Sequence, residues 1–199
     1  RLGEGRLKSV MARSEVGAAF MADSRARVHR TLGVCCATSG GGMMNLAVGI
    51  AESFAESVPV LAVVGQPPTV LEGRGAFQDS SGVGRTVNAV QMWSAIAKHV
   101  VRIESGASFW SDLRRAIDAA MSGRKGPAVL LVPRDVWTQE VGERPARWST
   151  NLDDFVRTPA PQMREVARLM SRIKHAKNPV LIMGTGVLRS KDQGDVAYF

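Results

Sequence analysis

The chain has 199 residues, of which 45% are hydrophobic and 22% are charged, a composition typical of a globular protein and not of a disordered or fibrous one. No apolar run approaches the roughly 18 residues of a membrane span, and no apolar signal segment follows the first residues, so we expect neither membrane insertion nor secretion. The net charge of +8 is spread along the sequence with few aromatic residues among the basic ones. This pattern favours anionic small molecules over nucleic acid as partners.

The sequence contains two cysteines and three histidines, the residue types that form disulfides and bind transition metals. Cys35 and Cys36 are adjacent in an apolar stretch, which predicts buried thiols in a reducing compartment, and hence the cytoplasm. His29, His99 and His175 are far apart in the sequence. Their spacing does not predict a metal site.

Strands and helices alternate through the first part of the chain. The hydrophobic pattern predicts a short strand at residues 8–12, a helix around residues 18–26, a buried strand at 30–38, a helix at 43–57 and a second buried strand at 58–64. Short turns connect them. This order is typical of an α/β protein with an open parallel sheet and helices on both faces.

The middle of the chain is predicted to contain a long loop and one more strand–helix–strand unit. Glycines favour a loop over residues 69–91, a length that is usually functional or disordered. A strand is expected at residues 98–103, a helix at 108–121 with Ser108 as its N-cap, and a strand at 128–132.

The composition then becomes charged and less apolar, which predicts an interdomain linker at residues 141–161. A helix at residues 163–173 and a strand at 179–183 are expected to follow. We therefore divide the chain into a domain at 1–140, the linker, and the start of a second, truncated domain at 162–199. So short a second part cannot bury a core of its own, which suggests a piece of a longer chain.

Glu15 is the first candidate functional residue. It lies between a predicted strand and a predicted helix, where a rigid scaffold can hold a carboxylate towards a cleft. A glutamate in this position can also simply complement the positive end of the helix dipole. The residue alone does not distinguish the two roles.

Five motifs in a fixed order identify a family resemblance. The motifs are residues 14–18, residues 37–42 with 45–46, residues 59–66, residues 76–79 and residues 126–136. Together they resemble the pyrimidine-binding domain of thiamine-diphosphate enzymes of the acetolactate synthase and 2-oxo acid decarboxylase superfamily. In that family the domain has the thiamine-diphosphate-binding fold, of which this chain would lack the first strand–helix unit. Residues 162–199 resemble the start of the family's central, Rossmann-like domain.

The resemblance implies a catalytic role for Glu15 and cofactor contacts for its neighbours. Glu15 matches the glutamate that hydrogen-bonds N1′ of the aminopyrimidine ring and so favours the tautomer that removes the proton from C2 of the thiazolium. Gly40 and Gly41 lie in a turn where the backbone can approach the flat ring closely. Asn45 matches a position that lines the cleft, although helix capping is an alternative role.

The implied substrate contacts are Phe77, Gln78 and Lys98, and Gln78 is also expected to contact the cofactor. A structural alternative remains for two of them. Phe77 could anchor the long loop, and Gln78 could form loop hydrogen bonds.

The sequence departs from the family pattern at two positions near the predicted site. Ser14 stands where the family commonly has histidine, and Gly41 stands where it commonly has proline. Residues 85–97 are also more numerous than expected for typical acetolactate synthases. These differences leave the substrate open.

Other parts of the family's active site are not in this sequence. The family holds Mg²⁺ with a Gly-Asp-Gly motif and a later Asn-Asn, which the sequence lacks, so the metal ligands are expected outside this chain. A flavin, which some synthases carry, would bind mostly in the central domain. The family's active site lies between subunits, which implies a homodimer or homotetramer and predicts that these 199 residues alone are inactive.

The function implied is decarboxylation of a 2-oxo acid such as pyruvate, with transfer of the activated aldehyde to an acceptor. Alternatives are a simple 2-oxo acid or oxalyl-CoA-type decarboxylase and a non-catalytic dimerisation fragment. A dinucleotide-binding loop at residues 39–42 fits poorly, because the full Gly-x-Gly-x-x-Gly spacing is missing.

Overall fold

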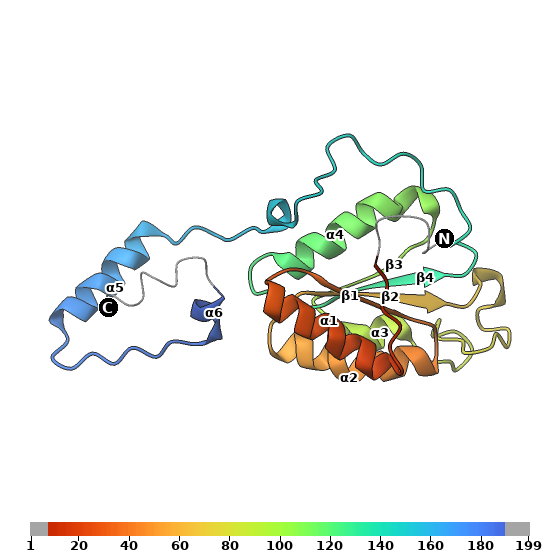
Figure 1. Cartoon of the computed structure of the whole chain (residues 1–199), viewed down its shortest axis with the longest axis horizontal. Helices are drawn as coiled ribbons and strands as arrows, with labels where there is room; N and C mark the ends of the chain where they lie inside the picture. The colour runs from red at the N-terminus through yellow and green to blue at the C-terminus, as the bar shows by residue number, and fades with distance from the viewer. Residues whose placement is uncertain (1–7, 190–199) are drawn as a thin grey trace. The chain divides into compact units, whose positions relative to one another are not determined.

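The computed structural model describes residues 8–189 and divides the chain into two compact units, Arg1–Arg157 and Thr158–Phe199. The first unit carries the sheet and the predicted site (Figure 1). Its elements, in chain order, are α1 (Glu15–His29), β1 (Gly33–Ala37), α2 (Gly41–Ala55), β2 (Val60–Gln66), the short helix η1 (Thr69–Leu71), α3 (Ala89–Ser94), β3 (His99–Arg102), the short helix η2 (Gly106–Ser108), α4 (Phe109–Met121), β4 (Ala128–Pro133) and the short helix η3 (Leu152–Phe155).

The four strands form one parallel sheet in the order β1-β2-β4-β3. Gly33 pairs with Val60, and Leu61 pairs with Ala128. Because every strand runs in the same direction, the carboxyl ends of all four lie at one edge of the sheet. β2 and β4 are the central strands and are almost wholly buried, as expected for strands covered on both faces. The predicted open parallel sheet is confirmed.

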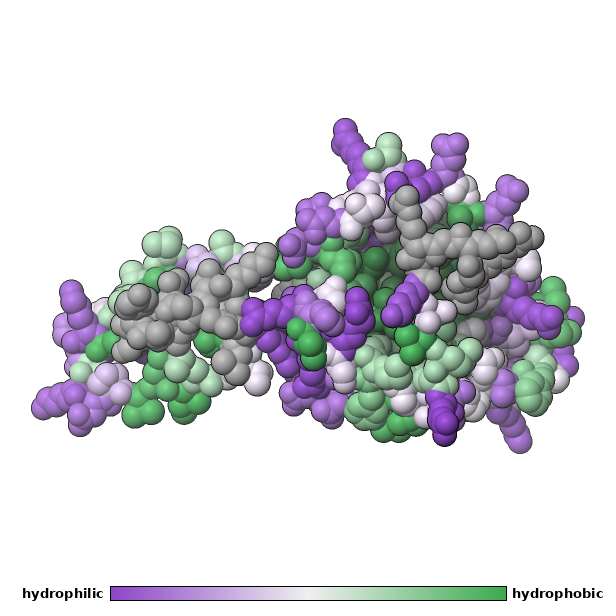
Figure 2. Space-filling model, viewed as in Figure 1, coloured by the Kyte–Doolittle hydropathy of each residue, from purple (hydrophilic) through white to green (hydrophobic). Residues whose placement is uncertain are grey.

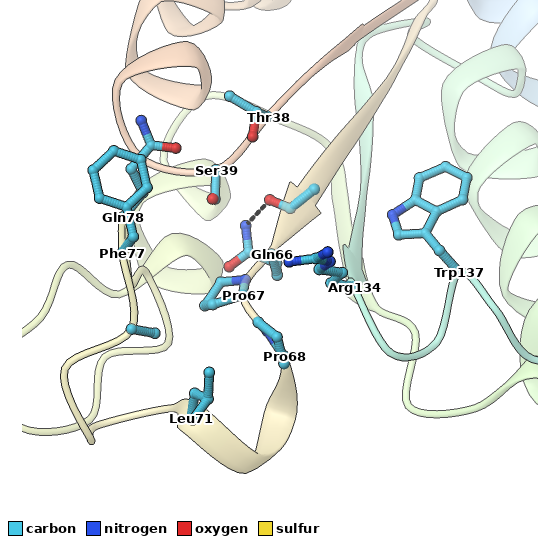
Figure 3. A pocket seen from close by; sticks show the side chains of 12 residues that line it. Thr38, Ser39, Gln66, Pro67, Pro68, Leu71, Phe77, Gln78, Arg134 and Trp137 are labelled. Carbon is cyan, nitrogen blue, oxygen red and sulfur yellow. Dashed lines mark hydrogen bonds between the residues drawn. The ribbon is translucent and has the colours of Figure 1, made fainter.

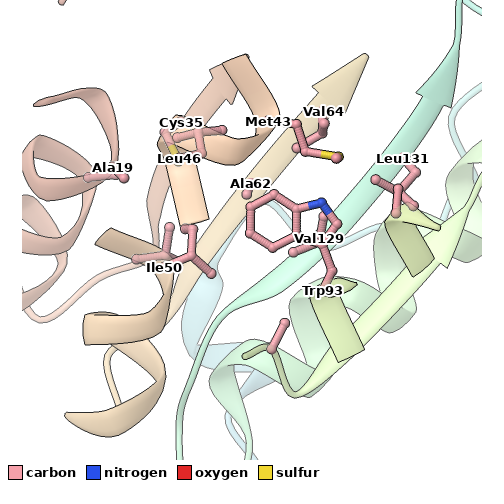
Figure 4. Packing of buried hydrophobic residues seen from close by; sticks show 14 of the residues in the cluster. Ala19, Cys35, Met43, Leu46, Ile50, Ala62, Val64, Trp93, Val129 and Leu131 are labelled. Carbon is pink, nitrogen blue, oxygen red and sulfur yellow. The ribbon is translucent and has the colours of Figure 1, made fainter. Parts of the chain in front are cut away.

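Helices α1, α2 and α3 cover one face of the sheet, and α4 covers the other (Figure 1). On the first face, Leu46 and Ile50 of α2 pack with Trp93 of α3 against the sheet (Figure 4). Trp93 is fully buried. This face therefore owes its core to the apolar spacing within α2 and to one large side chain from α3.

α4 packs on the opposite face and extends this second core into the segment expected to be a linker. Ile117 and Met121 of α4 are buried against the sheet. Phe155 of η3 is only 1% exposed, and Trp148 packs against it with 6.1 Å between the ring centroids. The boundary between the two units, at Arg157, falls inside the expected linker, but Trp148, Leu152, Phe155 and Val156 pack into the second core of the first unit.

Two predicted strands are not found. Residues 8–12 and 179–183 have no regular structure, and nearly all of them are exposed. An extended segment becomes a strand only where a neighbour accepts its backbone hydrogen bonds, and among the described residues neither segment has such a neighbour. The second unit contains α5 (Met163–His175) and α6 (Thr185–Leu188).

Figure 2 shows hydrophilic side chains distributed around the face in view, interspersed with apolar ones. None of the helices within residues 8–189 has both the length and the apolar character needed to cross a bilayer.

Candidate functional site

Glu15 is the first residue of α1, and the local sequence fixes its position. The hydroxyl of Ser14 accepts a hydrogen bond of 3.2 Å from the backbone N–H of Gly17, so Ser14 is the N-cap. Ser14 therefore has a structural role of its own at the position where the family commonly has histidine. α1 runs antiparallel to β1, which brings Glu15 to the carboxyl edge of the sheet beside the start of α2.

Glu15 is partly exposed, and its carboxylate lies beside the first turn of α2. Its Oε2 accepts a hydrogen bond of 3.1 Å from Nδ2 of Asn45, and the structure thus joins two residues that the sequence analysis proposed for one site. A Cβ placed on Gly42 would lie 3.2 Å from Oε1 of Glu15 and 2.9 Å from Cγ2 of Thr38. The hydrogen bond from Asn45, followed by the backbone N–H of Glu15 itself, lowers the pKa of this carboxyl.

Gly40 forms the sharp turn between β1 and α2 and lies against Gln78. Its φ of 61° belongs to the left-handed region that favours glycine. A Cβ at Gly40 would come within 2.6 Å of Cβ of Gln78. Gln78 itself has a φ of 57°, which holds the long loop in a tight turn at this point. Gly41, by contrast, is the first residue of α2 and has open space around it.

A cavity of about 490 Å³ opens at the carboxyl edge of the sheet, next to these residues (Figure 3). Phe77 and Gln78 reach it from the long loop, whereas Thr38 links it to the Glu15 pair. The ring of Phe77 is 86% exposed, so this side chain faces the cavity and does not anchor the loop in the core. The lining residues are Thr38, Ser39, Gly65, Gln66, Pro67, Pro68, Leu71, Ala76, Phe77, Gln78, Arg134 and Trp137.

Gln66, at the end of β2, was not predicted as a site residue. Its side chain is 5% exposed; Nε2 donates to the carbonyl oxygen of Gly65 at 2.7 Å, and Oε1 accepts from the hydroxyl of Ser80 at 2.7 Å. These bonds fix the amide at the base of the cavity. Its place directly after a buried parallel strand is the sequence signal that could have identified it.

Arg134 and Trp137, directly after β4, were also missed. Both line the cavity. The next residue, Asp135, accepts hydrogen bonds from the backbone N–H of Thr69 at 3.1 Å and from its hydroxyl at 2.6 Å. The Thr69 hydroxyl is the largest influence that lowers the pKa of Asp135. The loop after β4 is therefore tied to the loop after β2.

Lys98 lies away from Glu15 and from the cavity. It precedes β3, at the opposite edge of the sheet, and Nζ donates to the carbonyl oxygens of Ala119 and Ser122 at 2.5 and 2.9 Å. These carbonyls belong to the end of α4, so the structure gives Lys98 a capping role. Its position before the strand, and not after it, explains the difference from the expectation. Within residues 8–189, no group of three or more His, Cys, Asp or Glu side chains is arranged to hold a metal ion.

The arrangement of Glu15, the glycine turn and the cavity agrees with a comparison against known families. Residues 1–84 match the family described as thiamine pyrophosphate enzyme, N-terminal TPP binding domain. This part of the chain is similar to the thiamine pyrophosphate enzymes. The match contains Glu15, Gly40, Asn45 and Gln78.

Relatives of the acetolactate synthase type extend the similarity to most of the chain. A probable acetolactate synthase large subunit of Methanococcus aeolicus is 33% identical over 183 residues, which are 91% of this chain and 29% of the relative. An acetolactate synthase of Arthrospira platensis is 32% identical, over 97% of this chain and 32% of the relative. The acetolactate synthase isozyme 2 large subunit of Escherichia coli is 31% identical, over 94% and 32%. The chain thus spans roughly a third of the length of these relatives.

Proposed function

We propose that this chain supplies the pyrimidine-binding side of the active site in a thiamine-diphosphate-dependent enzyme. The enzyme decarboxylates a 2-oxo acid such as pyruvate and transfers the activated aldehyde unit to an acceptor, as an acetolactate synthase does. One observation carries the proposal. A partly exposed glutamate, Glu15, is held by Asn45 at the carboxyl edge of a parallel sheet, beside Gly42, whose lack of a side chain lets α2 start close to Oε1.

The residues present fit the aminopyrimidine ring, because Glu15 is partly exposed and Asn45 holds its carboxylate through Oε2. A Cβ at Gly42 would lie only 3.2 Å from Oε1 of Glu15, so glycine lets the first turn of α2 pack close to the carboxylate. Thiamine diphosphate, when bound, supplies an electron sink at C2 of its thiazolium ring. Glu15 holds or releases a proton at Oε1 towards the ring nitrogen, and Asn45 keeps the carboxylate oriented through Oε2. An amide in place of Glu15 could still form a hydrogen bond but could not move the proton.

The remaining site residues have supporting roles in this proposal. Gly40, Gly41 and Asn45 contribute backbone and amide contacts to the cofactor side, and Gln78 borders both cofactor and substrate. Phe77 contacts the substrate because its exposed ring lines the cavity. Lys98 is not included, since it caps α4 at the other edge of the sheet.

Several parts of the complete enzyme are expected outside the residues discussed so far. Magnesium would be bound by residues outside this chain, a flavin by the central domain, and the active site would be completed by a partner subunit of a homodimer or homotetramer.

The cytoplasmic location expected from the thiols also stays a prediction. Cys35 and Cys36 are both free, but Cys36 is exposed and not buried as expected. The two domains proposed at 1–140 and 162–199 belong to the same hypothesis.

The proposal is tested on the protein that carries this chain, isolated from its source cells with an antibody against this segment. With thiamine diphosphate, Mg²⁺ and D₂O, exchange of the C2 proton is followed by acid quench and NMR. Glu15→Gln should slow this exchange by about 100-fold or more, the range of general acid–base catalysis. Acetolactate should form from pyruvate in the unaltered protein.

Glu143→Gln is the matched control, because Glu143 is exposed and lies outside the site. It should leave the exchange rate unchanged. Equal exchange rates for Glu15→Gln and the unaltered protein would remove the catalytic role and leave the chain as a dimerisation fragment. Release of free acetaldehyde without acetolactate would instead identify a simple decarboxylase.

A further inference from the structure

We propose that the cavity at the carboxyl edge of the sheet selects a 2-oxo acid with an aromatic or similarly bulky apolar group, with Arg134 binding the carboxylate and with Trp137 and Phe77 enclosing the apolar part. This inference deepens the proposed function and rests on it, since the cofactor chemistry makes the carboxylate ligand a 2-oxo acid. The cavity itself supplies the size and the charge of that ligand.

The charge of the cavity favours a monoanion. Among the described residues that line it, Arg134 is the only charged one. Within residues 8–189, no carboxylate forms an ion pair with Arg134. A guanidinium group binds a carboxylate through two parallel hydrogen bonds, a geometry that a neutral ligand cannot match.

The apolar lining favours a ligand with a large hydrocarbon part. Two aromatic side chains border the cavity while remaining largely open to solvent: Phe77 is 86% exposed and Trp137 is 59% exposed. In Figure 3 the Phe77 ring and the Trp137 indole lie on opposite sides of the view, with Gln66 and Arg134 between them. Aromatic rings gain most from burial against another flat apolar group. The other apolar lining residues are Pro67, Pro68, Leu71 and Ala76.

The size of the cavity also favours a ligand with a large hydrocarbon part. Its volume of about 490 Å³ is within the range of roughly 300–1,000 Å³ that small-molecule sites occupy. The methyl group of pyruvate would leave most of this space to water and both aromatic rings exposed. A ring on the ligand would occupy more of it and could contact the aromatic lining.

Arg134 and Trp137 are held in place by their own loop. The backbone N–H of Trp137 donates to the carbonyl oxygen of Pro133 at 3.2 Å, and Val136 between them is 5% exposed. Asp135 ties the same loop to Thr69. A loop fixed at three successive residues holds the backbone of Arg134 and Trp137 at the cavity, so little backbone entropy is lost on binding.

The test follows the indole N–H resonance of Trp137 in the ¹⁵N-labelled 199-residue chain, assigned by its loss in Trp137→Phe. The probes are phenylpyruvate, pyruvate, 3-phenylpropanoate and the neutral 3-phenylpropanamide. We expect phenylpyruvate to bind at least 10-fold more tightly than pyruvate, and 3-phenylpropanoate at least 10-fold more tightly than 3-phenylpropanamide. The indole signals of Trp110 and Trp148, which pack together at 5.1 Å between centroids, should not shift.

Substitutions in the cavity distinguish binding of the ligand's carboxylate from binding of its apolar group. Arg134→Gln should weaken 3-phenylpropanoate at least 10-fold and leave the amide unchanged, whereas Arg144→Gln, at an exposed arginine outside the lining, should change neither. Trp137→Ala, followed by the ligand's own resonances, should remove the preference for phenylpyruvate over pyruvate.

Equal affinity for phenylpyruvate and pyruvate, or Arg134→Gln without effect on the carboxylate, would overturn the inference. The readout needs no thiamine diphosphate and does not involve Glu15. Its failure is therefore distinct from a failure of the exchange experiment that tests the proposed function.

Discussion

Asn45 Nδ2 donates a hydrogen bond of 3.1 Å to Oε2 of Glu15, and this bond joins the N-terminal parts of α1 and α2. Both side chains are accessible enough to meet a ligand, yet each restricts the other. The bond favours the ionised carboxylate, so the pKa of Glu15 lies below its ordinary value before any cofactor binds. Asn45 thereby strengthens the preference of Glu15 for the ionised form.

The substitution Asn45→Ala should raise the pKa of Glu15 towards the ordinary value of a glutamate, because the ionised form loses its donor. NMR titration of the Glu15 carboxyl carbon measures this directly. Since the pKa of Glu15 is lowered in the folded state, its contribution to stability is present above the ordinary glutamate pKa and is lost as the pH falls through the folded value. Asn151→Ala, at an exposed asparagine of η3, is the control and should leave the Glu15 titration where it was.

Gly49→Ala should destabilise the fold. An added Cβ at this position of α2 would lie 2.5 Å from Cβ of Ala19 and 3.2 Å from the backbone N of Phe20 in α1. The helices must move apart, which typically costs about 1–3 kcal/mol for overpacking. Urea unfolding followed by circular dichroism measures the loss.

Gly41→Ala is the matched comparison for Gly49→Ala. Gly41 begins the same helix with open space around it and without a positive φ. We expect the unfolding free energy of the Gly41→Ala variant to equal that of the unaltered chain or to exceed it by about 0.4–1 kcal/mol, because alanine restricts the unfolded chain. Equal destabilisation by both substitutions would contradict close packing of α1 on α2.

One thiol per native chain should react with Ellman's reagent at pH 8. Burial raises the pKa of the Cys35 thiol to about 12, whereas Cys36 is exposed on the other side of β1. The reactive thiolate of Cys35 is therefore almost absent at this pH. In denaturant two thiols should react, and Cys36→Ser should remove the fast one; rapid reaction of two thiols in the native chain would disprove the assignment.

His99 should make the fold less stable in weak acid. Burial lowers the pKa of this imidazole, and the positive charge of Arg115 lowers it further, whereas the negative charge of Asp112 raises it. The Nε2 atom of His99 is buried and has no hydrogen-bond partner among the described residues. The unfolded chain then binds the proton more readily, so stability falls as the pH drops below about 6.5.

The His99→Gln variant should show a flatter dependence of its unfolding midpoint between pH 7 and pH 5. His29→Gln, at an exposed position, should retain the original slope. An identical slope for both variants and the unaltered chain would mean that His99 protonates as freely when folded as when unfolded.

The order of helices and strands could be predicted from the sequence because it depends on local patterns. The apolar runs of β2 and β4 and the spacing within α2 and α4 are readable within a few residues. Residues 8–12 and 179–183 show the limit, since an apolar segment is a strand only if a partner lies beside it, and pairing is not a local property.

The candidate site, like the fold, could be predicted from the sequence only in part. Glu15, Gly40 and Asn45 come from one helix–strand–helix unit, α1-β1-α2, whose two helices flank β1. Gln66 and Arg134 meet at the cavity only because β2 and β4 are neighbours in the order β1-β2-β4-β3, which pairs Gln66 with Pro133 although they are distant in the sequence. Sequence patterns alone do not contain that neighbour relationship.

Phe155 has a consequence for any shortened form of this protein. Its ring lies beneath the guanidinium of Arg114 at 4.4 Å, and its carbonyl oxygen accepts from the hydroxyl of Ser122 at 2.7 Å. A chain that ended at residue 140 would lack Phe155, and the apolar surface of α4 that Phe155 covers would be exposed and prone to aggregation. A protease that nicks the exposed residues 141–147 would have the opposite result, since the two pieces would remain joined through the aromatic side chains and behave as a split protein.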